Sequence, residues 1–288
     1  MSLKIGIFGA GKLANAIVEE MKAVNASARS GGSASGPTRA ASPAAGSGAG
    51  GSTSADAGHA QPTSVAVPAR FTLAWMVDLG DAIPDTLIDA AIDASAPNAV
   101  ESHIEWAVAR GVPLVVAATG WDIPDLAARV GTKTAVLVSP NFSFAVTFMR
   151  TIAAQVARFA DWYGQGDIGI YEHHHAAKLD APSGTAKALA QSVIGASARY
   201  SGWNMSGADP WSKENIPIAS MRAGSEAGVH EILFDAPHEQ FSIVHRARDR
   251  RVFAVGALKA VEWVVGKKGL FGMDDVLATL FGREAQRQ

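Results

Sequence analysis

Cysteine is missing from this chain of 288 residues. Its absence excludes disulfide bonds, thiolate metal ligands and a cysteine nucleophile, and it fits a reducing compartment. Long hydrophobic runs are also missing, because no apolar stretch approaches the ~20 residues that a membrane-spanning helix needs. Neither sign of charge is in large excess: the formal net charge is −2 at pH 7, which gives no reason to expect nucleic acid or a membrane as a partner. We therefore expect a soluble, cytoplasmic protein.

Large hydrophobic side chains are scarce in one internal segment, residues 25–69, which consists almost entirely of Ala, Gly, Ser, Thr and Pro. Such a segment cannot bury enough apolar surface to offset the entropy lost on ordering. It lies where a short helix-to-strand connection is expected. We therefore predict a disordered, low-complexity insertion in a surface loop.

Strand and helix patterns alternate through the first half of the chain, which predicts a parallel sheet with helices on both faces. The predicted strands are 3–8, 71–77, 89–94, 112–117 and 134–138, and the predicted helices are 13–24, 98–110 and 122–130. After about residue 142 the pattern changes to strands at 166–172, 216–223, 227–235 and 240–247, with helices at 144–160 and 184–197. Hairpin-connected strands of this kind indicate an antiparallel or mixed sheet.

The predicted fold class is therefore α/β, with an N-terminal Rossmann-like dinucleotide-binding domain and a smaller α+β domain that has a mixed sheet. We place the first domain at 1–141 and the second at 142–250. Residues 251–288, with predicted helices at 254–265 and 273–281, are expected to return to the first domain.

A glycine-rich turn, Gly9-Ala10-Gly11-Lys12-Leu13-Ala14, follows the first predicted strand. It fits the G-x-G-x-x-G/A pattern, in which the first glycine allows a tight turn and the second lets the backbone approach a pyrophosphate. The third position must be small for helix and strand to pack, and the helix start offers free N–H groups to phosphates. We expect Gly9, Gly11, Lys12 and Leu13 to bind a dinucleotide. An ordinary glycine-rich turn is the alternative.

Asp78 ends the second predicted strand, where a dinucleotide-binding fold places an acid beside the ribose 2′-OH. That acid normally follows the turn by ~20 residues, and the segment 25–69 accounts for most of the excess here. A carboxylate at this place favours NADH, whereas Lys12 could meet the 2′-phosphate of NADPH. The sequence thus leaves NADH or NADPH open as the cofactor, and an ordinary acidic strand end is the alternative for Asp78.

Three consecutive histidines, His173, His174 and His175, form the most unusual segment of the chain. In an extended backbone the first and third share one side and the second takes the other. A metal site is one alternative, since an i, i+2 histidine pair supplies two ligands and Asp180 or Glu172 could supply a third. We expect no metal, and we expect His174 to transfer a proton, because imidazole titrates near neutrality.

A turn and a helix start follow the histidines, in the sequence DAPSGT, with Ser183 at or near the N-cap. The N–H groups of Gly184 and Thr185 would then point out of the helix toward a carboxylate. Lys178 and His175 supply cationic or donor groups nearby. We predict that this segment holds a small dicarboxylate and protonates it while hydride arrives from a nicotinamide.

The pattern E-x-H-H-x-x-K-x-D-A-P-S-G-T-A, from Glu172 to Ala186, resembles the signature of the 4-hydroxy-tetrahydrodipicolinate reductase family, formerly called dihydrodipicolinate reductase. Further segments resemble the family's motifs in the same order, and everything except 25–69 is covered. These segments are Asp93–Pro97, Ala117–Gly120, Pro140–Ser143, Arg222–Gly224, Gly228–His230, Phe253–Ala257 and Gly269–Phe271.

The resemblance implies an NADH- or NADPH-dependent reductase of a cyclic intermediate in the lysine and diaminopimelate pathway, assembled as a homotetramer through the sheet of the second domain. It implies that His174 is the proton donor and that Lys178 assists it and binds substrate. The residues implied to hold the substrate carboxylates are His175, Ser183, Gly184 and Thr185. Besides the glycine turn, the residues implied to line the cofactor are Ala117, Ala118, Thr119, Asn141, Phe142 and Arg250.

Three departures from the family pattern bear on cofactor affinity and preference. The turn is G-x-G-x-x-A where the family commonly has G-x-x-G-R-M-G, so Lys12 replaces an arginine contact only loosely. The G-T-T-G loop has become Ala117-Ala118-Thr119-Gly120, which removes one hydroxyl beside the nicotinamide. Ala176 and Ala177 stand where the family often has polar residues.

Two other classes of protein serve as alternatives. One is a different two-domain nicotinamide oxidoreductase acting on a small dicarboxylate. A semialdehyde dehydrogenase would need a cysteine, and a sugar-type oxidoreductase usually carries an E-K-P-type motif where this chain has Ser139-Pro140-Asn141. The other is a non-catalytic nucleotide- or metal-binding module that uses the histidine run, which tight zinc binding without NAD(P)H oxidation would favour.

Overall fold

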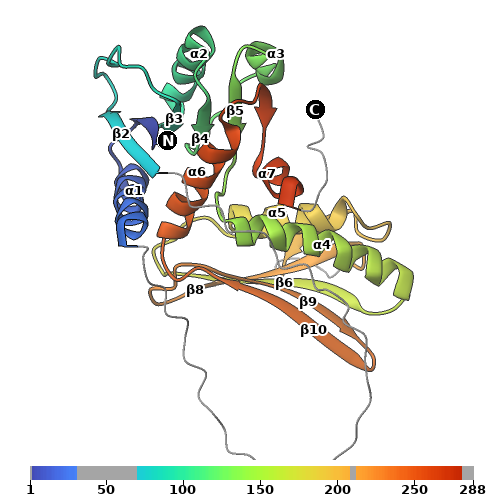
Figure 1. Ribbon diagram of the computed structural model, residues 1–288. Helices are drawn as coiled ribbons and strands as arrows, with labels where there is room; N and C mark the ends of the chain where they lie inside the picture. Colours follow the sequence, from blue (N-terminus) through green and yellow to red (C-terminus); the bar gives the residue numbers. More distant parts are fainter. Residues whose placement is uncertain (1, 31–69, 208–211, 281–288) are drawn as a thin grey trace, which may run out of the picture.

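Two β-sheets organise the chain in the computed structural model, which describes residues 2–30, 70–207 and 212–280 (Figure 1). The first sheet has six parallel strands in the order β11-β5-β4-β3-β1-β2. Their bounds are β1 (Ser2–Phe8), β2 (Arg70–Val77), β3 (Ala90–Asp93), β4 (Leu114–Val116), β5 (Ala135–Val138) and β11 (Gly269–Phe271). The central strands are buried apolar runs, as expected for a parallel sheet covered on both faces.

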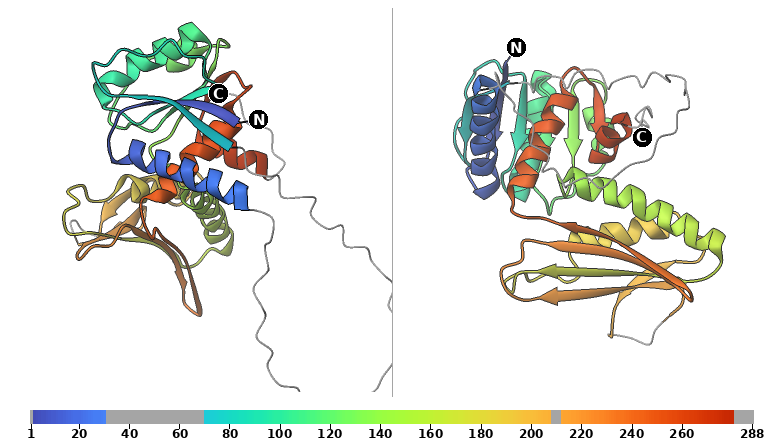
Figure 2. Two further views of the ribbon diagram at one scale, coloured as in Figure 1. Left: turned by 60° about the vertical axis from the view of Figure 1, so that its left-hand side comes forward. Right: turned by 60° about the horizontal axis from the view of Figure 1, so that its bottom comes forward.

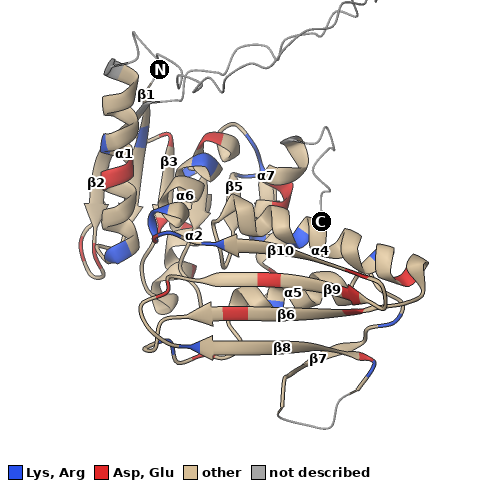
Figure 3. Ribbon diagram, turned by 90° about the horizontal axis from the view of Figure 1, so that it is seen from below, with Lys and Arg blue, Asp and Glu red and all other residues tan. Residues whose placement is uncertain are grey.

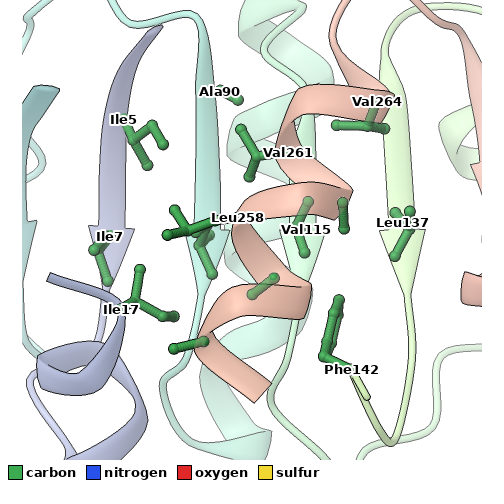
Figure 4. Packing of buried hydrophobic residues seen from close by; sticks show 14 of the residues in the cluster. Ile5, Ile7, Ile17, Ala90, Val115, Leu137, Phe142, Leu258, Val261 and Val264 are labelled. Atoms are coloured by element: carbon green, nitrogen blue, oxygen red, sulfur yellow. The ribbon is translucent and has the colours of Figure 1, made fainter. Parts of the chain in front are cut away.

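Helices cover both faces of this sheet, as predicted. On one face α1 (Lys12–Ser30) and α6 (Arg251–Val264) pack against the strands through a continuous apolar cluster. Figure 4 shows α6 lying across the strands, with Leu258 and Val261 directed at Ile5, Ile7 and Val115. On the other face lie α2 (Val100–Arg110), after the short 3₁₀ helix at Pro97–Ala99, and α3 (Leu126–Val130).

The described part of the C-terminal segment packs on the first sheet. After the second sheet, α6 packs on the strands of the first, β11 extends that sheet beside β5, and α7 (Met273–Leu280) follows. Strand β11 was not predicted, because it is only three residues long and lies among glycines and lysines.

The first helix is longer than predicted. It runs to Ser30, so residues 25–30 are helical where the sequence predicted the start of the disordered insertion. Asn25 anchors this extension: its Nδ2 donates to the Phe71 carbonyl at 2.6 Å and its Oδ1 accepts from the Phe71 N–H at 3.2 Å. The remainder of the predicted insertion, 31–69, lies outside the described residues. In contrast, the helix predicted at 122–130 is shorter than expected, because α3 begins only at Leu126.

The second sheet is mixed, in the order β10-β9-β6-β8-β7. Strand β6 runs parallel to β8 and antiparallel to β9, and β9 and β10 form a hairpin. The bounds are β6 (Asp167–His174), β7 (Gly202–Met205), β8 (Asn215–Arg222), β9 (Val229–Ala236) and β10 (Glu239–Arg246). Strand β7 was not predicted, because GWNM is only four residues long and shows no clear alternation of apolar and polar side chains.

Two helices, α4 (Phe144–Tyr163) and α5 (Gly184–Ile194), cover one face of the second sheet and lie between it and the first sheet (Figures 1 and 2). The other face is open in the single chain, and Figure 3 shows few charged residues along its strands. Met221 and Val244 on it are 45% and 55% exposed. Within the described residues, no helix combines the length and apolar character needed to cross a membrane.

Candidate active site

The predicted cofactor residues gather at one edge of the first sheet. Strand β1 lies between β2 and β3, so the chain direction of the crossovers reverses there, and ligands of such sheets bind outside the carboxyl ends of the strands at this point. Gly9, Asp78, Asp93, Ala117 and Asn141 follow the ends of five successive parallel strands or close them. The topology therefore brings together residues that lie up to 132 positions apart.

The glycine turn connects β1 to α1 in the geometry that the motif predicts. Gly9 has a φ of +95°, donates its N–H to the Val77 carbonyl at 2.7 Å, and lies so close to β3 that a Cβ would approach the Ala94 carbonyl oxygen to 2.6 Å. A Cβ at Gly11 would meet no heavy atom within 4 Å. Ala14 is fully buried beneath the turn. Gly9 is thus required by the fold, whereas Gly11 leaves open space in front of the helix start.

Two acidic side chains lie just after β2, where the sequence predicts the residue that meets an adenosine ribose. Asp78 accepts from the N–H of Leu79 through Oδ1 at 2.9 Å, and its own N–H donates to Asp81 Oδ2 at 2.8 Å. Lys12 is exposed in the first turn of α1. Two carboxylates and one lysine therefore border this end of the site.

The loops after β4 and β5 are fixed by backbone hydrogen bonds. The N–H groups of Ala117 and Ala118 donate to the Asp93 carbonyl at 2.8 and 3.1 Å, and Thr119 is exposed beyond them. The side chain of Phe142 is buried in the apolar cluster under α6 (Figure 4), and the residue as a whole is only 3% exposed. Arg250 is exposed immediately before α6, where the chain crosses from the second sheet to the first.

Strand alternation in β6 directs the histidines to opposite faces. Glu172 and His174 are buried on the face covered by the helices, and His173 points to the other face, where its Nε2 meets the Ala223 carbonyl at 3.0 Å. This confirms the predicted separation of His174 from His173. His175 lies just past the end of β6, and its N–H donates to the Glu226 carbonyl.

A buried carboxylate, Glu172, lies at the centre of the site. Its Oε1 accepts from the Ser183 N–H at 3.0 Å, from Ser220 Oγ at 2.7 Å and from Arg222 Nη2 at 2.7 Å. Its Oε2 lies 3.3 Å from His174 Nδ1. Burial would raise the pKa of Glu172, but the hydrogen bonds from Ser183, Arg222 and Ser220 outweigh it and hold the pKa at about 2, below its ordinary value. The carboxylate is therefore ionised at neutral pH.

The pKa values of the neighbouring imidazoles are lowered. Burial lowers the pKa of His174, Glu172 opposes this by attraction, and Lys178 adds to it by repulsion. Burial, reinforced by repulsion from His174, lowers the pKa of His230 to about 3. Burial also lowers the pKa of His245. In the absence of ligand the site thus holds one ionised carboxylate among neutral imidazoles.

The helix start at Ser183 has the predicted capping geometry. Ser183 is the N-cap of α5, its Oγ accepts from the Ala186 N–H at 3.2 Å, and it contacts His230 Nε2 at 3.1 Å. The first N–H groups of a helix have no intrahelical partner, and Gly184, the first residue of α5, is exposed with no heavy atom within 4 Å of a Cβ position. An anion can therefore approach Gly184 and Thr185 at the positive end of the helix.

Lys178 lies in the loop between β6 and α5. Its Nζ contacts Asp180 Oδ1 at 2.6 Å, and its side chain is 24% exposed. Arg222 donates to the Asp180 carbonyl at 2.6 Å, which ties the loop to β8. The lysine is therefore anchored beside the helix start and can exchange its carboxylate partner for one on a ligand.

One hydrogen bond joins the two predicted binding regions. Asn141, at the end of the first sheet, donates from Nδ2 to Thr185 Oγ1 in the first turn of α5 at 3.0 Å. Asn141 Oδ1 in turn accepts from the Ser143 N–H at 2.8 Å. The cofactor edge of the first sheet therefore faces the helix start of the second.

Glu172, one candidate third ligand of the alternative metal site, lies on the face of β6 opposite His173. Among the described residues, the grouping with ligand atoms within 4.8 Å of one another is instead Glu172, His174 and His230. Arg222 already places a cation on the Glu172 carboxylate, which disfavours a second positive charge there.

The roles of four residues escaped the sequence reasoning. Arg222 and His230 stood in motifs of the family without an assigned role, Glu172 was named only as a candidate metal ligand, and Ser220 was not singled out. Period-2 alternation was the available signal, because it places Glu172 on the same face as His174. The pairing of β6 with β8 and β9, which aligns Ser220 and His230 with Glu172, is not visible in the sequence.

Comparison with known proteins agrees with this geometry. The family model "Dihydrodipicolinate reductase, N-terminus" matches residues 3–142, and "Dihydrodipicolinate reductase, C-terminus" matches 145–277. The chain is 34% identical over 200 residues to the 4-hydroxy-tetrahydrodipicolinate reductase of Christiangramia forsetii, covering 68% of this chain and 82% of that one. It is 36% identical over 199 residues to that of Neisseria meningitidis, covering 66% and 72%. A dipicolinate-bound dihydrodipicolinate reductase from Paenisporosarcina has the same fold, with a TM-score of 0.67 at 19% identity over 96% of this chain and all of that one.

Proposed function

The chain belongs to the dihydrodipicolinate reductase family, and from this premise we propose how its own residues carry out the reaction. The reaction is the NAD(P)H-dependent reduction of 4-hydroxy-tetrahydrodipicolinate to tetrahydrodipicolinate in the diaminopimelate and lysine pathway. The observation that carries the proposal is the contact between Asn141 and Thr185, because it sets the cofactor edge of one sheet against the dicarboxylate-binding helix start of the other.

The substrate carboxylates bind at the start of α5. The N–H groups of Gly184 and Thr185 and the hydroxyl of Thr185 receive one carboxylate at the positive end of the helix. His175 and Lys178 receive the other, and Lys178 leaves Asp180 to do so. Ser183 acts as the N-cap that keeps these N–H groups free for the ligand. The two clamps fix the ring in one orientation against the first sheet, which supplies the positioning part of catalysis.

His174 donates the proton that balances hydride addition to the conjugated imine, once the substrate hydroxyl has left as water. In the free protein, burial keeps the pKa of His174 low. A bound dicarboxylate brings negative charge beside the imidazole and satisfies the charge of Lys178, and both effects raise the pKa. Protonation of His174 is therefore coupled to substrate binding, which places the acid where and when it is used.

The residues at the edge of the first sheet fit NADH or NADPH, which supplies the hydride when bound. The open space at Gly11 lets a pyrophosphate approach the start of α1, and Ala14 allows α1 to pack close beneath it. Asp78 would meet the adenosine ribose. The Ala117–Thr119 loop, the backbone at Asn141 and Phe142, and Arg250 would border the nicotinamide half.

The test is a steady-state comparison of His174→Ala and Lys178→Ala with freshly prepared substrate. His174→Ala is expected to lower kcat by about 10²–10⁴ with KM nearly unchanged, whereas Lys178→Ala lowers kcat and raises KM. His238→Ala, in the exposed β9–β10 turn, is the matched control and should leave both parameters unchanged. Equal and mild losses at His174 and Lys178 would contradict these roles.

We propose further that the chain divides functionally at residues 141 and 250, with 251–288 completing the dinucleotide-binding domain.

The second sheet has one open face in the single chain, and we propose that this face joins the subunits of a homotetramer. Tyr171 and Met221 lie on it, with the Tyr171 hydroxyl 3.5 Å from Met221 Sδ. Sedimentation equilibrium of the wild type and of Val244→Glu tests this, because a charge on that face should dissociate the assembly. We also propose that the enzyme is cytoplasmic, which cell fractionation would test. Its partner there is the small-molecule substrate.

A further inference from the structure

We propose that Glu172 is a positioning residue, whose carboxylate joins the proton donor His174 to the substrate-binding helix start at Ser183. One carboxylate oxygen orients the imidazole, and the other fixes the first turn of α5. The inference rests on the proposed role of His174, and it goes beyond that role by assigning a reason for the imidazole's tautomer and direction.

The sheet register places Glu172 between its partners. In the central strand β6, Glu172 is aligned with Ser220 of β8 on one side and with His230 of β9 on the other, and His230 is aligned with His245 of β10. All four side chains belong to the face that α4 and α5 cover. A single row across four strands thus carries the carboxylate and two imidazoles, with His174 two residues further along β6.

The Oε1 atom of Glu172 is fully occupied. Three donors reach it, the N–H of Ser183, the hydroxyl of Ser220 and the guanidinium of Arg222, at 3.0, 2.7 and 2.7 Å. Arg222 provides the compensating charge that a buried carboxylate needs. The carboxylate therefore stays in place whether His174 is neutral or charged. Oε1 also links the start of α5, through the Ser183 N–H, to Ser220 and Arg222 of β8.

The Oε2 atom is free to serve His174. Glu172 is 0% exposed, and neither Oε2 nor His174 Nδ1 forms a hydrogen bond among the described residues, either with each other or with a third group. The two atoms are 3.3 Å apart. A turn of the imidazole that directs a proton on Nδ1 at Oε2 would satisfy both buried atoms, whereas a proton on Nε2 alone leaves two acceptors facing each other. Glu172 therefore selects the Nδ1–H tautomer.

The opposite nitrogen of His174 is directed away from the carboxylate. A Cβ at Gly228 would lie 3.1 Å from Nε2, so the glycine keeps this side of the ring uncrowded. With Nδ1 held by Glu172, it is Nε2 that receives and transfers the proton. The carboxylate also stabilises the imidazolium before transfer, as a carboxylate does for a catalytic histidine in other enzymes.

The charges around His174 set the direction of the pH effect. Glu172 favours the imidazolium, and so does Asp180 more weakly from the loop, whereas Lys178 and Arg222 oppose it. His230 packs against His174 with ring centroids 5.1 Å apart, and His245 stacks behind His230. Since the surrounding cations would remain, removal of the Glu172 charge is expected to lower the pKa of His174.

The experiment compares the pH dependence of kcat for the wild type, Glu172→Gln and Ser220→Ala. The amide can still accept from the Ser183 N–H but carries no charge. We expect Glu172→Gln to lower kcat by about 10–100-fold, to leave KM within about threefold, and to move the alkaline limb of the profile by about one unit to lower pH. Ser220→Ala removes one hydrogen bond to Oε1 and should leave the limb in place.

An alkaline limb that stays at the wild-type pH in Glu172→Gln would overturn the proposal. A limb that moves equally in Ser220→Ala would also overturn it, because loss of packing alone would then explain the shift. If Gln at 172 prevents folding, Glu172→Asp carries the same test: its shorter side chain draws the charge away from Nδ1, so the limb should move the same way by less, and an unmoved limb overturns the proposal.

Titration of His174 by NMR separates this inference from the proposed catalytic role. The imidazole pKa in protein with labelled histidine is expected to fall in Glu172→Gln, whether or not His174 is the proton donor. If His174→Ala retains turnover while the NMR titration shifts as expected, the catalytic role fails and the contact stands. If turnover depends on His174 but the pKa of His174 is the same in Glu172→Gln as in the wild type, the positioning role of Glu172 is wrong and the catalytic role of His174 stands.

Discussion

The two glycines of the β1–α1 turn offer a sharp test of the cofactor site, because the structure separates their functions. At Gly9 an alanine would need the unfavourable φ of +95° and would bring Cβ to 2.6 Å from the Ala94 carbonyl oxygen. The left-handed backbone costs an alanine about 1–2 kcal/mol and the overpacking about 1–3 kcal/mol. We therefore expect Gly9→Ala to lower the free energy of unfolding by about 2–5 kcal/mol.

At Gly11 the same methyl group meets no protein atom within 4 Å. The free energy of unfolding should fall by about 0.5–1.5 kcal/mol, less than at Gly9, since Gly11 lies at the N-cap of α1, where alanine is less favourable than glycine. The methyl group would instead occupy the space through which a pyrophosphate approaches the helix N-terminus. We expect the Kd for NADH and NADPH to rise about 10–100-fold, the equivalent of about 1.4–2.7 kcal/mol.

Urea unfolding and titration of NADH by fluorescence measure the two effects on the same samples. The matched variants carry the same added atom two residues apart, so a general effect of alanine in the turn would appear in both. If Gly11→Ala binds NADH as the wild type does, the turn is not the pyrophosphate site. If Gly9→Ala is as stable as the wild type, the assigned contact with β3 is wrong.

Three further predictions follow from single features. Asp78→Ala should lower the kcat/KM ratio of NADH over NADPH by about tenfold, because one of two carboxylates near the ribose is lost; an unchanged ratio would assign the preference elsewhere. Gly256→Ala would place Cβ 1.7 Å from the Phe142 carbonyl oxygen and should lower the free energy of unfolding by at least about 1–3 kcal/mol in urea; wild-type stability would refute this packing. The pKa of His230 is about 3 when folded and 6.5 otherwise, so stability present above pH 6.5 is lost as the pH falls through this window, by up to about 1.4 kcal/mol per unit. His230→Gln should therefore lose less stability than the wild type between pH 7 and 5, and an identical loss would contradict the burial argument.

The parallel sheet and its turn were predictable because their signals are local. Buried strands such as 3–8 are continuous apolar runs, and the glycine pattern follows one of them directly. The end of α1 was not predictable in the same way, because its last turns are held by a bond from Asn25 to Phe71, across 46 residues of sequence. Composition alone made residues 25–30 look like part of the insertion.

In the candidate site, too, the local features were predictable from the sequence and the long-range contacts were not. His174, Lys178 and Ser183 lie within one short segment, so their chemistry and the N-cap were visible in the sequence. The environment that sets their behaviour comes from β8 and β9, which follow β6 by some 50 residues of sequence and flank it in space. The contacts of Arg222 and His230 with Glu172 and its neighbours therefore became evident only from the strand order and register.

We propose that the start of α5, flanked by His174 and Lys178, holds the substrate against the cofactor bound at the edge of the first sheet. A crystal structure of the enzyme with NADH and dipicolinate tests it most directly. We predict one carboxylate on the N–H groups of Gly184 and Thr185, His174 Nε2 facing the ring, and the nicotinamide on the ring's other side. Dipicolinate bound away from α5, or a nicotinamide pointing away from it, would contradict the account.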